Sequence, residues 1–354
     1  MSKHFRQLVV KEVIKETKDA VSIVFEIPSD QKQDFKYKAG QYLTIKADIK
    51  GESVRRSYSL SSSPTIDSFL KVTSKKVENG KMSHYLYDHV NVGDTLDVML
   101  PDGNFVLDTD AIRSNRYVLF AAGSGITPII SILKTALEEE PRSAVHLVYG
   151  NRNIEDIIFY DELEALSTKY SGRLSIQYII SQGAIDGGRN NTRITPEIVS
   201  AIVAEEQQHA AAKMYFICGP EGMIEGTNEA LKSAGIDSNV IHIEHFTNSA
   251  IDEGKETVYE GEVNEVTAIL DGVEHKLILQ KGETILEAAD RQGIDPPYSC
   301  QSGVCTTCKA LVTRGEVEMG ESFGLDDEEI AEGFVLTCCS RPKSAGVIVS
   351  YDDI

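Results

Sequence analysis

The stretch "CQSGVCTTC", residues 300–308, places three of the chain's six cysteines within nine positions. Cysteines clustered in this way form disulfides, hold a metal or supply a catalytic thiol, and the choice decides the fold of the C-terminal part. The complete spacing is C-x4-C-x2-C, then 29 residues, then Cys338. A catalytic thiol needs no such set of partners, so the spacing favours a metal.

A 2Fe-2S cluster is the metal centre that this spacing predicts, because four thiolates spaced C-x4-C-x2-C…C hold two irons in plant-type clusters. The predicted ligands are Cys300, Cys305, Cys308 and Cys338. Gly303, inside the loop, lets backbone N–H groups turn toward the sulfides. Structural zinc is the alternative, although zinc sites prefer two C-x2-C pairs and the chain has one. Cys339 has no assigned role and is expected to be a small, partly buried residue.

The composition indicates a globular protein of two or three domains. Of 354 residues, 41% are apolar and 25% are charged. The N-terminus "MSKHFRQLVV" lacks the apolar region of a secretory signal. The most apolar run, 117–133, is interrupted by Gly, Ser, Thr and Pro and is shorter than the roughly 20 residues of a membrane span. We therefore expect a cytoplasmic protein without membrane insertion, where clustered cysteines bind metal more often than they form disulfides.

The net charge of −20 argues against nucleic-acid binding, which needs a basic face. From Glu262 to the end there are 18 acidic and 7 basic residues, so the last quarter of the chain is especially acidic. Such a domain offers a docking surface to a basic partner protein. Solubility alone explains the charge equally well.

The spacing of apolar residues changes along the chain and predicts several domains. Residues 1–110 alternate apolar and polar positions in short runs, as in an antiparallel β-barrel, with one short helix near 83–89. Residues 111–246 alternate apolar strands with helices, which predicts an α/β domain with a parallel sheet. Residues 247–261 are polar and are typical of a linker, and 262–354 predict an α+β domain that opens with a hairpin turned at Asp271-Gly272.

Four upstream stretches carry polar residues at the ends of predicted strands. These are "RRSYSLSSSP" (55–64), "NGKMSHYL" (79–86), "LFAAGSGITPIISIL" (119–133) and "FICGPEGM" (216–223). Each has an ordinary structural interpretation: a polar strand edge, a helix start, a tight strand–helix turn and a core cysteine. The G-x-G of Gly123 and Gly125 is a weak nucleotide signal by itself, because Pro128 stands where a third glycine is usual.

Two regions of the chain, the cysteine loop and the first of these stretches, resemble known families. "PPYSCQSGVCTTCKALVTRGEV" and "GFVLTCCSRP" match the cluster-binding stretches of plant-type ferredoxins, which implies a β-grasp fold. "RRSYSLSSSP" resembles the R-x-Y-S flavin signature of the ferredoxin–NADP reductase family. The resemblance implies that Arg56 pairs with the flavin diphosphate, Tyr58 stacks on the flavin ring and Ser59 hydrogen-bonds near the ring.

The resemblance extends to the other stretches. It implies that Gly80, Lys81, Met82 and Ser83 offer backbone N–H groups to the same diphosphate, and a second phosphate-binding stretch favours FAD over FMN. It assigns the nicotinamide site to residues of two loops: Gly123, Gly125, Thr127, Cys218, Gly219 and Pro220. Tyr58, Ser59, Thr127 and Cys218 are the predicted catalytic residues. Glu244 and Phe246, in "IHIEHF", match positions near the flavin ring. The last strand of a sheet would explain the apolar residues of this stretch equally well.

NADPH is the expected donor. The second parallel strand ends "LVYGNRN", with Arg152 and no acid before Glu155, and Arg193 with Arg189 could complete a basic pocket for a 2′-phosphate. Ordinary solvated arginines are the plainer interpretation. Gln182 stands where many NADP-specific relatives have arginine, which keeps NADH open.

Together the modules predict a NAD(P)H-dependent reductase that passes electrons through FAD to a 2Fe-2S cluster and on to a separate oxygenase, because flavins convert hydride transfer to single-electron transfer. "GSGITP", "YGNRN", "FICGP" and "IEHF" resemble in particular the reductase components of phenylacetyl-CoA epoxidases. A reductase of another hydroxylase or desaturase is the first alternative. A metal-stabilised binding module without reductase activity is the second.

Overall fold

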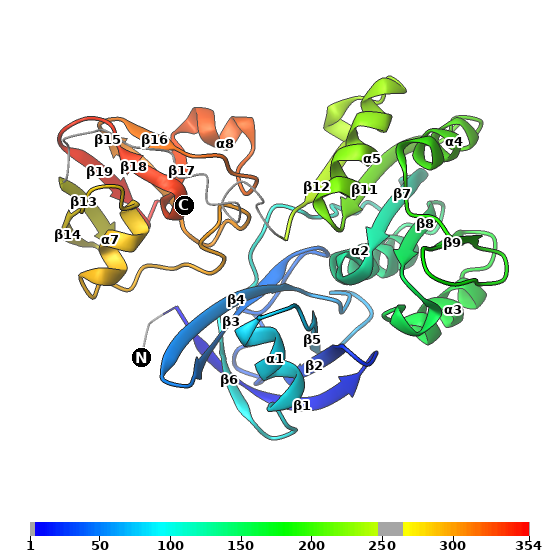
Figure 1. The fold of residues 1–354 in the computed structure, drawn as a ribbon, viewed down its shortest axis with the longest axis horizontal. Helices are drawn as coiled ribbons and strands as arrows, with labels where there is room; N and C mark the ends of the chain where they lie inside the picture. The colour runs from blue at the N-terminus through cyan, green and yellow to red at the C-terminus, as the bar shows by residue number, and fades with distance from the viewer. Residues whose placement is uncertain (1–3, 247–264, 354) are drawn as a thin grey trace.

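The computed structural model describes residues 4–246 and 265–353, which form three bodies, each built on one main sheet (Figure 1). The predicted linker, 247–261, lies outside the described residues. Within the described ranges, no helix combines the length and apolar character that crossing a membrane requires. The predicted classes of all three folds are confirmed: an antiparallel barrel, a parallel α/β sheet and a ferredoxin-like fold.

The first body is a six-stranded antiparallel sheet curled into a barrel, with strand order β4-β3-β6-β1-β2-β5. The elements are β1 (Arg6–Lys15), β2 (Ala20–Glu26), β3 (Tyr42–Ile49), β4 (Glu52–Ser59), β5 (Leu70–Lys75), α1 (Lys81–Asp88) and β6 (Thr95–Val98). Alternate apolar residues point inward and form one buried core, which includes Leu8, Ile23 and Leu43. The Ser61 amide donates to the Lys71 carbonyl at 2.7 Å, so the chain after β4 returns to β5 and the curl closes.

The second body is a parallel sheet with strand order β10-β9-β8-β7-β11-β12. Its strands are β7 (Asn115–Ala122), β8 (Ala144–Asn151), β9 (Leu174–Ile180), β10 (Arg189–Asn190), β11 (Ala212–Cys218) and β12 (Ile241–Glu244). Helices α2 (Ile126–Glu139) and α3 (Tyr160–Lys169) bury one face of the sheet, and α4 (Pro196–Glu206) and α5 (Glu221–Ser233) bury the other. The strand order reverses between β7 and β11, where sheets of this kind bind ligands beyond the carboxyl ends of the strands.

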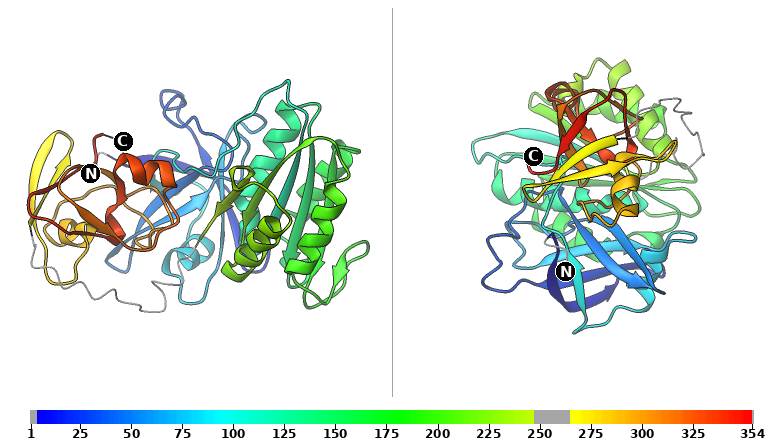
Figure 2. Two further views of the ribbon diagram at one scale, coloured as in Figure 1. Left: turned by 90° about the horizontal axis from the view of Figure 1, so that it is seen from above. Right: turned by 90° about the vertical axis from the view of Figure 1, so that its left-hand side faces the viewer.

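The third body is a small mixed sheet with strand order β14-β13-β19-β15-β17. Its elements are β13 (Glu265–Leu270), β14 (Val273–Ile278), α7 (Ile285–Arg291), β15 (Lys309–Arg314), β16 (Val317–Met319), α8 (Asp327–Glu332), β17 (Phe334–Leu336), β18 (Ser340–Pro342) and β19 (Val347–Ser350). The hairpin turns at Asp271 and Gly272, both with positive φ, as the sequence predicts. The cysteine loop lies between α7 and β15. Figure 2 shows this third body beside the barrel, on the side away from α3 and β9.

Candidate functional site

The strand β4 presents the predicted flavin residues at its end. Arg56 is exposed, and its guanidinium donates to the carbonyl of Arg55 at 2.7 Å. Tyr58 is half-buried, and burial raises the pKa of its phenol to about 12, so the ring remains neutral. Ser59 is buried. An exposed guanidinium and an aromatic ring two residues apart on one strand point to the same face, which suits an anionic, planar ligand.

The start of α1 lies beside this strand, because the Lys81 ammonium pairs with the Glu52 carboxylate at the start of β4, 2.6 Å away. Gly80 caps the helix, and a methyl group there would lie 2.4 Å from a Val77 methyl and 2.5 Å from the Ser83 hydroxyl. Lys81, Met82 and Ser83 form the first turn, where backbone N–H groups have no partner within the helix. The side chain of Lys81 thus contacts Glu52, and its backbone is the part suited to a phosphate.

The loops that follow β7 and β11 meet at the reversal of strand order. A methyl group at Gly125 would lie 2.1 Å from the Cys218 carbonyl oxygen, and one at Gly219 would lie 2.7 Å from the Met223 side chain. Glycine is therefore required for the contact between the two loops. Thr127 is buried in the first turn of α2 and donates to the Ser124 carbonyl at 3.1 Å. Gly123 has a φ of 54°, and Pro220 precedes α5 as its cap.

An acidic residue connects the barrel to the place where the strand order of the parallel sheet reverses. Glu244 pairs with Cys218 in the register of β11 and β12, and the Ser59 hydroxyl donates to its carboxylate at 3.3 Å. Burial raises the pKa of Glu244 to about 8. Burial, with the nearby Glu244 charge, also raises the pKa of the Cys218 thiol well above its ordinary value, so Cys218 is a neutral thiol. The structure thus brings Ser59, Cys218 and Glu244 together, and Glu244 was implied only by the resemblance.

The residues predicted to bind a 2′-phosphate lie near the carboxyl ends of β8 and β9, where the Thr192 amide donates to the Ile180 carbonyl at 3.1 Å. Arg152 and Arg193 are exposed there, and Phe246, after β12, is 40% exposed. Asn151, the last residue of β8, has both amide atoms buried without a hydrogen-bond partner among the described residues. A buried, unpaired amide at the ligand-binding edge of such a sheet fits a polar ligand group. No sequence pattern indicates Asn151, since its burial depends on the packing of neighbouring strands.

The four predicted cluster cysteines gather in the third body. The sulfur atoms of Cys300 and Cys305 lie 3.1 Å apart, and the Ser302 amide donates to Cys300 at 3.3 Å. Hydrogen bonds from Cys305 and Cys338 hold the pKa of Cys300 well below its ordinary value, and the same bonds raise the pKa of both donors. Four cysteine sulfurs brought together in this way are a donor set that fits iron. The Cys339 thiol instead donates to the Leu336 carbonyl at 3.4 Å.

Comparisons with known proteins identify all three bodies. Family models match an oxidoreductase FAD-binding domain at residues 7–107, an oxidoreductase NAD-binding domain at 119–229 and a 2Fe-2S iron-sulfur cluster binding domain at 268–343. The chain is 38% identical to one of the subunits of 1,2-phenylacetyl-CoA epoxidase from Escherichia coli (strain K12), over 98% of each chain. It is 37% identical to the ferredoxin reductase component of 3-ketosteroid-9-alpha-monooxygenase from Rhodococcus rhodochrous, over 97% of this chain and 96% of that one.

Solved structures agree over the whole length. Phthalate dioxygenase reductase, described as a modular structure for electron transfer from pyridine nucleotides to 2Fe-2S, superposes with a TM-score of 0.60 at 25% identity and 98% coverage of both chains. An intact type IV self-sufficient cytochrome P450 monooxygenase gives a TM-score of 0.72 at 23% identity. The present chain corresponds to 41% of that longer protein, and the likeness shows the shared fold.

The fold, the matched families and the whole-length relatives define an oxidoreductase that uses NAD(P)H, FAD and a 2Fe-2S cluster. The chain belongs to the ferredoxin–NADP reductase family, in the group that carries a C-terminal ferredoxin domain and forms the reductase component of oxygenase systems. The choice of FAD over FMN is confirmed. Membership of an enzyme family also sets aside the alternative of a binding module without activity.

Proposed function

We propose that this reductase takes electrons from NADPH and delivers them to an oxygenase that resembles phenylacetyl-CoA epoxidase. The observation that carries the proposal is the 38% identity to a component of that system over 98% of both chains. The relatives from 3-ketosteroid-9-alpha-monooxygenase, at 37% identity, favour a reductase of a different hydroxylase as the second candidate. A desaturase partner, the other part of that alternative, stays a prediction.

The residue roles in this proposal are those that the family resemblance implies, and the geometry of the site supports them. Arg56 and the N–H groups at the start of α1 bind the FAD diphosphate, and Tyr58 stacks on the flavin ring. Thr127, Cys218, Gly219 and Pro220 shape the nicotinamide pocket. Bound FAD supplies the conversion from hydride transfer to single-electron transfer. Ser59 and Glu244, which are hydrogen-bonded to each other, orient the two ring systems and keep water from them.

The cluster ligands in this proposal are Cys300, Cys305, Cys308 and Cys338. The acceptor docks on the acidic ferredoxin domain, where helix α8 begins with the acidic residues Asp327, Glu328 and Glu329. A basic face on the oxygenase would accelerate association through electrostatic attraction. None of the six cysteines, all of which lie in the described parts of the chain, forms a disulfide, which supports a reducing cytoplasm as the location.

Reconstitution tests the choice of acceptor. The purified reductase is combined with the oxygenase components of the E. coli phenylacetyl-CoA epoxidase or of the Rhodococcus 3-ketosteroid monooxygenase, and NADPH-driven product formation is measured. We expect turnover with the epoxidase components to exceed turnover with the monooxygenase by about tenfold or more, as specific docking predicts. Equal rates, or a preference for the monooxygenase, would reject the proposed acceptor and leave the reductase assignment intact.

Donor preference has its own test. We expect kcat/KM for NADPH to exceed that for NADH, and Arg152→Ala to lower it for NADPH about 10- to 100-fold, because a charge-assisted contact of about 1.5–3 kcal/mol is removed. The value for NADH should be unchanged. Arg314→Ala, at an exposed position in the ferredoxin domain, is the matched control. A wild-type protein that prefers NADH would show the donor assignment to be wrong.

A further inference from the structure

The strand β4 contacts two different parts of the molecule through its two faces. Arg56 and Tyr58 belong to the flavin signature, whereas Arg55 and Ser57 contact the ferredoxin domain. Successive side chains of a strand point to opposite faces, so one strand can serve both at once. Figure 1 shows β4 along the upper edge of the barrel, facing the third body.

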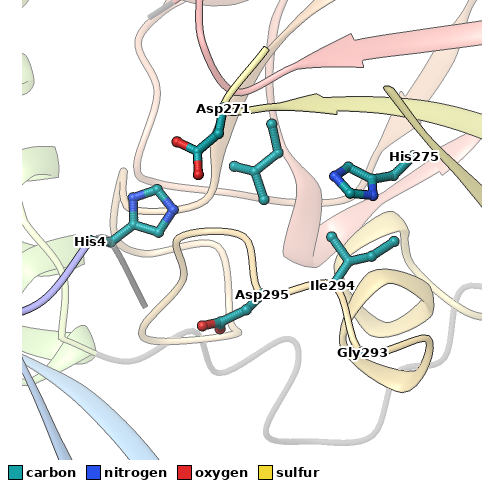
Figure 3. Close-up of a pocket in the computed structure, with 7 residues that line it drawn as sticks. His4, Asp271, His275, Gly293, Ile294 and Asp295 are labelled. Carbon is teal, nitrogen blue, oxygen red and sulfur yellow. The ribbon is translucent and has the colours of Figure 1, made fainter. Parts of the chain in front are cut away.

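The contacts of Arg55 and Ser57 attach this edge to the segment just before the cysteine loop. Arg55 is buried, forms an ion pair with Asp295, and lies 4.0 Å above the ring of Tyr298. The Ser57 hydroxyl donates to the Ser299 hydroxyl at 2.8 Å. Ser299 directly precedes Cys300. Asp295 also lines a cavity of about 230 Å³, together with His4 and other residues of the ferredoxin domain (Figure 3). The partner of Arg55 therefore lies at the boundary between the barrel and the ferredoxin domain.

The neighbouring strand contributes a second contact, inside the cysteine loop itself. Thr306 and Thr307 stand between Cys305 and Cys308, and both are buried. The Thr306 amide donates to the Tyr42 phenol oxygen at 3.2 Å, and the Thr307 hydroxyl lies 3.0 Å from the same oxygen. Tyr42 is the first residue of β3 and is paired with Ser59 of β4. A residue opposite the flavin signature therefore touches the loop between two predicted cluster ligands.

Asp102 holds this contact in place. Its carboxylate accepts hydrogen bonds from the Tyr42 hydroxyl at 3.0 Å and from the Thr306 hydroxyl at 2.8 Å. The backbones of Tyr42 and Asp102 also exchange two hydrogen bonds, at 2.9 and 3.1 Å. A methyl group at Gly103 would lie 2.9 Å from the Tyr42 ring, so the glycine lets the ring pack closely. The barrel thus fixes the phenol before it meets the ferredoxin domain, which is how a positioning group is preorganised.

We propose that Tyr42, held by Asp102, is a positioning residue. It sets the distance between the cysteine loop, residues 300–308, and strand β4, and so the rate of electron transfer within the chain. Arg55 and Ser57 complete the docking surface. The proposal rests on the proposed site roles but not on the identity of the oxygenase. It is therefore tested without any acceptor protein.

The first experiment uses Tyr42→Phe, which removes the hydroxyl and keeps the ring. Rapid mixing with NADPH should show unchanged flavin reduction, whereas reduction of the cluster, followed in its visible bands, should slow about tenfold, because the rate of electron transfer falls steeply as the distance and orientation of the two centres change. Tyr37→Phe is the matched control, because its hydroxyl bonds Ser62 within the barrel at 2.8 Å. A normal rate of cluster reduction in Tyr42→Phe would overturn the proposal.

A readout independent of electron transfer is hydrogen exchange. The amide of Thr306 donates to Tyr42, so its exchange should be about tenfold faster in Tyr42→Phe than in wild type. The Tyr37→Phe control should leave it unchanged. Unchanged exchange at Thr306 in Tyr42→Phe would show that the contact does not hold the loop.

Covalent rescue separates positioning from a general folding effect. The hydroxyl oxygens of Ser57 and Ser299 are 2.8 Å apart, so Ser57→Cys with Ser299→Cys should form a disulfide across the same interface. Added to Tyr42→Phe, the oxidised pair should restore cluster reduction to within about twofold of wild type, and a reductant should abolish the rescue. Each single cysteine variant is first checked for intact cluster bands. A disulfide that forms without restoring the rate would overturn the positioning role, while Tyr42→Phe and its control remain decisive if the added cysteines disturb the cluster.

Discussion

Glu244 occupies an unusual place for a carboxyl group, between a buried thiol and a buried hydroxyl at the junction of two domains. Burial penalises the charged form and raises its pKa from 4.5 to about 8, against the opposing hydrogen bond from Ser59. The carboxyl is therefore mostly protonated in the folded protein at neutral pH. Its family role was implied by resemblance, but the neutral state could not be inferred from sequence, because it depends on packing between strands of two domains.

This shift predicts a pH-dependent stability. Below pH 4.5 the carboxyl is protonated in both states. As the pH rises toward 8 the unfolded state loses its proton first, so stability falls, and above about 8 the loss is complete. Glu244→Gln lacks this component. The difference in Tm between Glu244→Gln and wild type should therefore grow between pH 5 and 8 and level off above. Thermal unfolding at several pH values measures it, and a constant difference would contradict the raised pKa.

Cys338 and Cys339 are adjacent cysteines with different surroundings. The Cys338 thiol interacts with those of Cys300 and Cys308, whereas the Cys339 thiol donates to a backbone carbonyl. We predict that Cys339→Ser retains the cluster's visible absorption and that Cys338→Ser loses or shifts it, because one substitution removes a ligand and the other does not. The two variants are each other's control. The opposite pattern would mean that the ligand register is displaced by one residue.

At the scale of elements, local rules predicted most of the fold. Alternation predicted the barrel strands, and longer apolar runs between helices predicted β7, β8, β9, β11 and β12. The two-residue strand β10 was not predicted, since so short a segment has no periodicity. The candidate site shows a different limit. Motifs indicated Arg56, Tyr58 and the cysteines. The burial of Asn151 and the contact between Tyr42 and Thr306, two residues that are 264 positions apart, depend instead on tertiary packing.

The contact between the β7 and β11 loops gives a prediction at this scale. In Gly125→Ala the methyl group would lie 2.1 Å from the Cys218 carbonyl oxygen, so one loop must move. We expect a Tm several degrees lower and a KM for NADPH raised about tenfold or more, because the loops carry the residues proposed to bind the nicotinamide. FAD content should be preserved. Gly222→Ala, exposed in α5 with nothing within 4 Å of the added methyl, is the control and should retain both values. Wild-type kinetics in Gly125→Ala would show that the loop contact is not needed.

At the scale of the whole molecule, two interfaces differ in character. Lys134 of α2 binds Asp67 of the barrel at 2.6 Å and Glu162 of α3 at 2.9 Å, and Glu162 also binds Lys71 of β5 at 3.1 Å. Both lysines are buried, and breaking such a network is costly, so the barrel and the parallel sheet behave as one unit. The ferredoxin domain contacts this unit through β3 and β4 and through the stacked rings of His245 and Phe323. The cluster is thus attached to a flavin–nicotinamide unit that has its own core.

That separation predicts that the two halves of the electron path can be tested independently. Cys308→Ala removes a buried cysteine sulfur from the ferredoxin domain, so the cluster should be lost or become labile, while FAD and the nicotinamide site, which lie in the other unit, should be retained. NADPH oxidation with ferricyanide, a small acceptor that reacts with the flavin directly, should stay within about twofold of wild type, as expected for an unperturbed site. Reduction of a protein acceptor should nearly vanish.

Cys339→Ala, the same substitution at a cysteine outside the ligand set, should retain both activities. Tyr58→Ala should impair both, because every route passes through the flavin. If Cys308→Ala still reduced the protein acceptor at the normal rate, the cluster would not lie on the path, and the order of cofactors would be wrong.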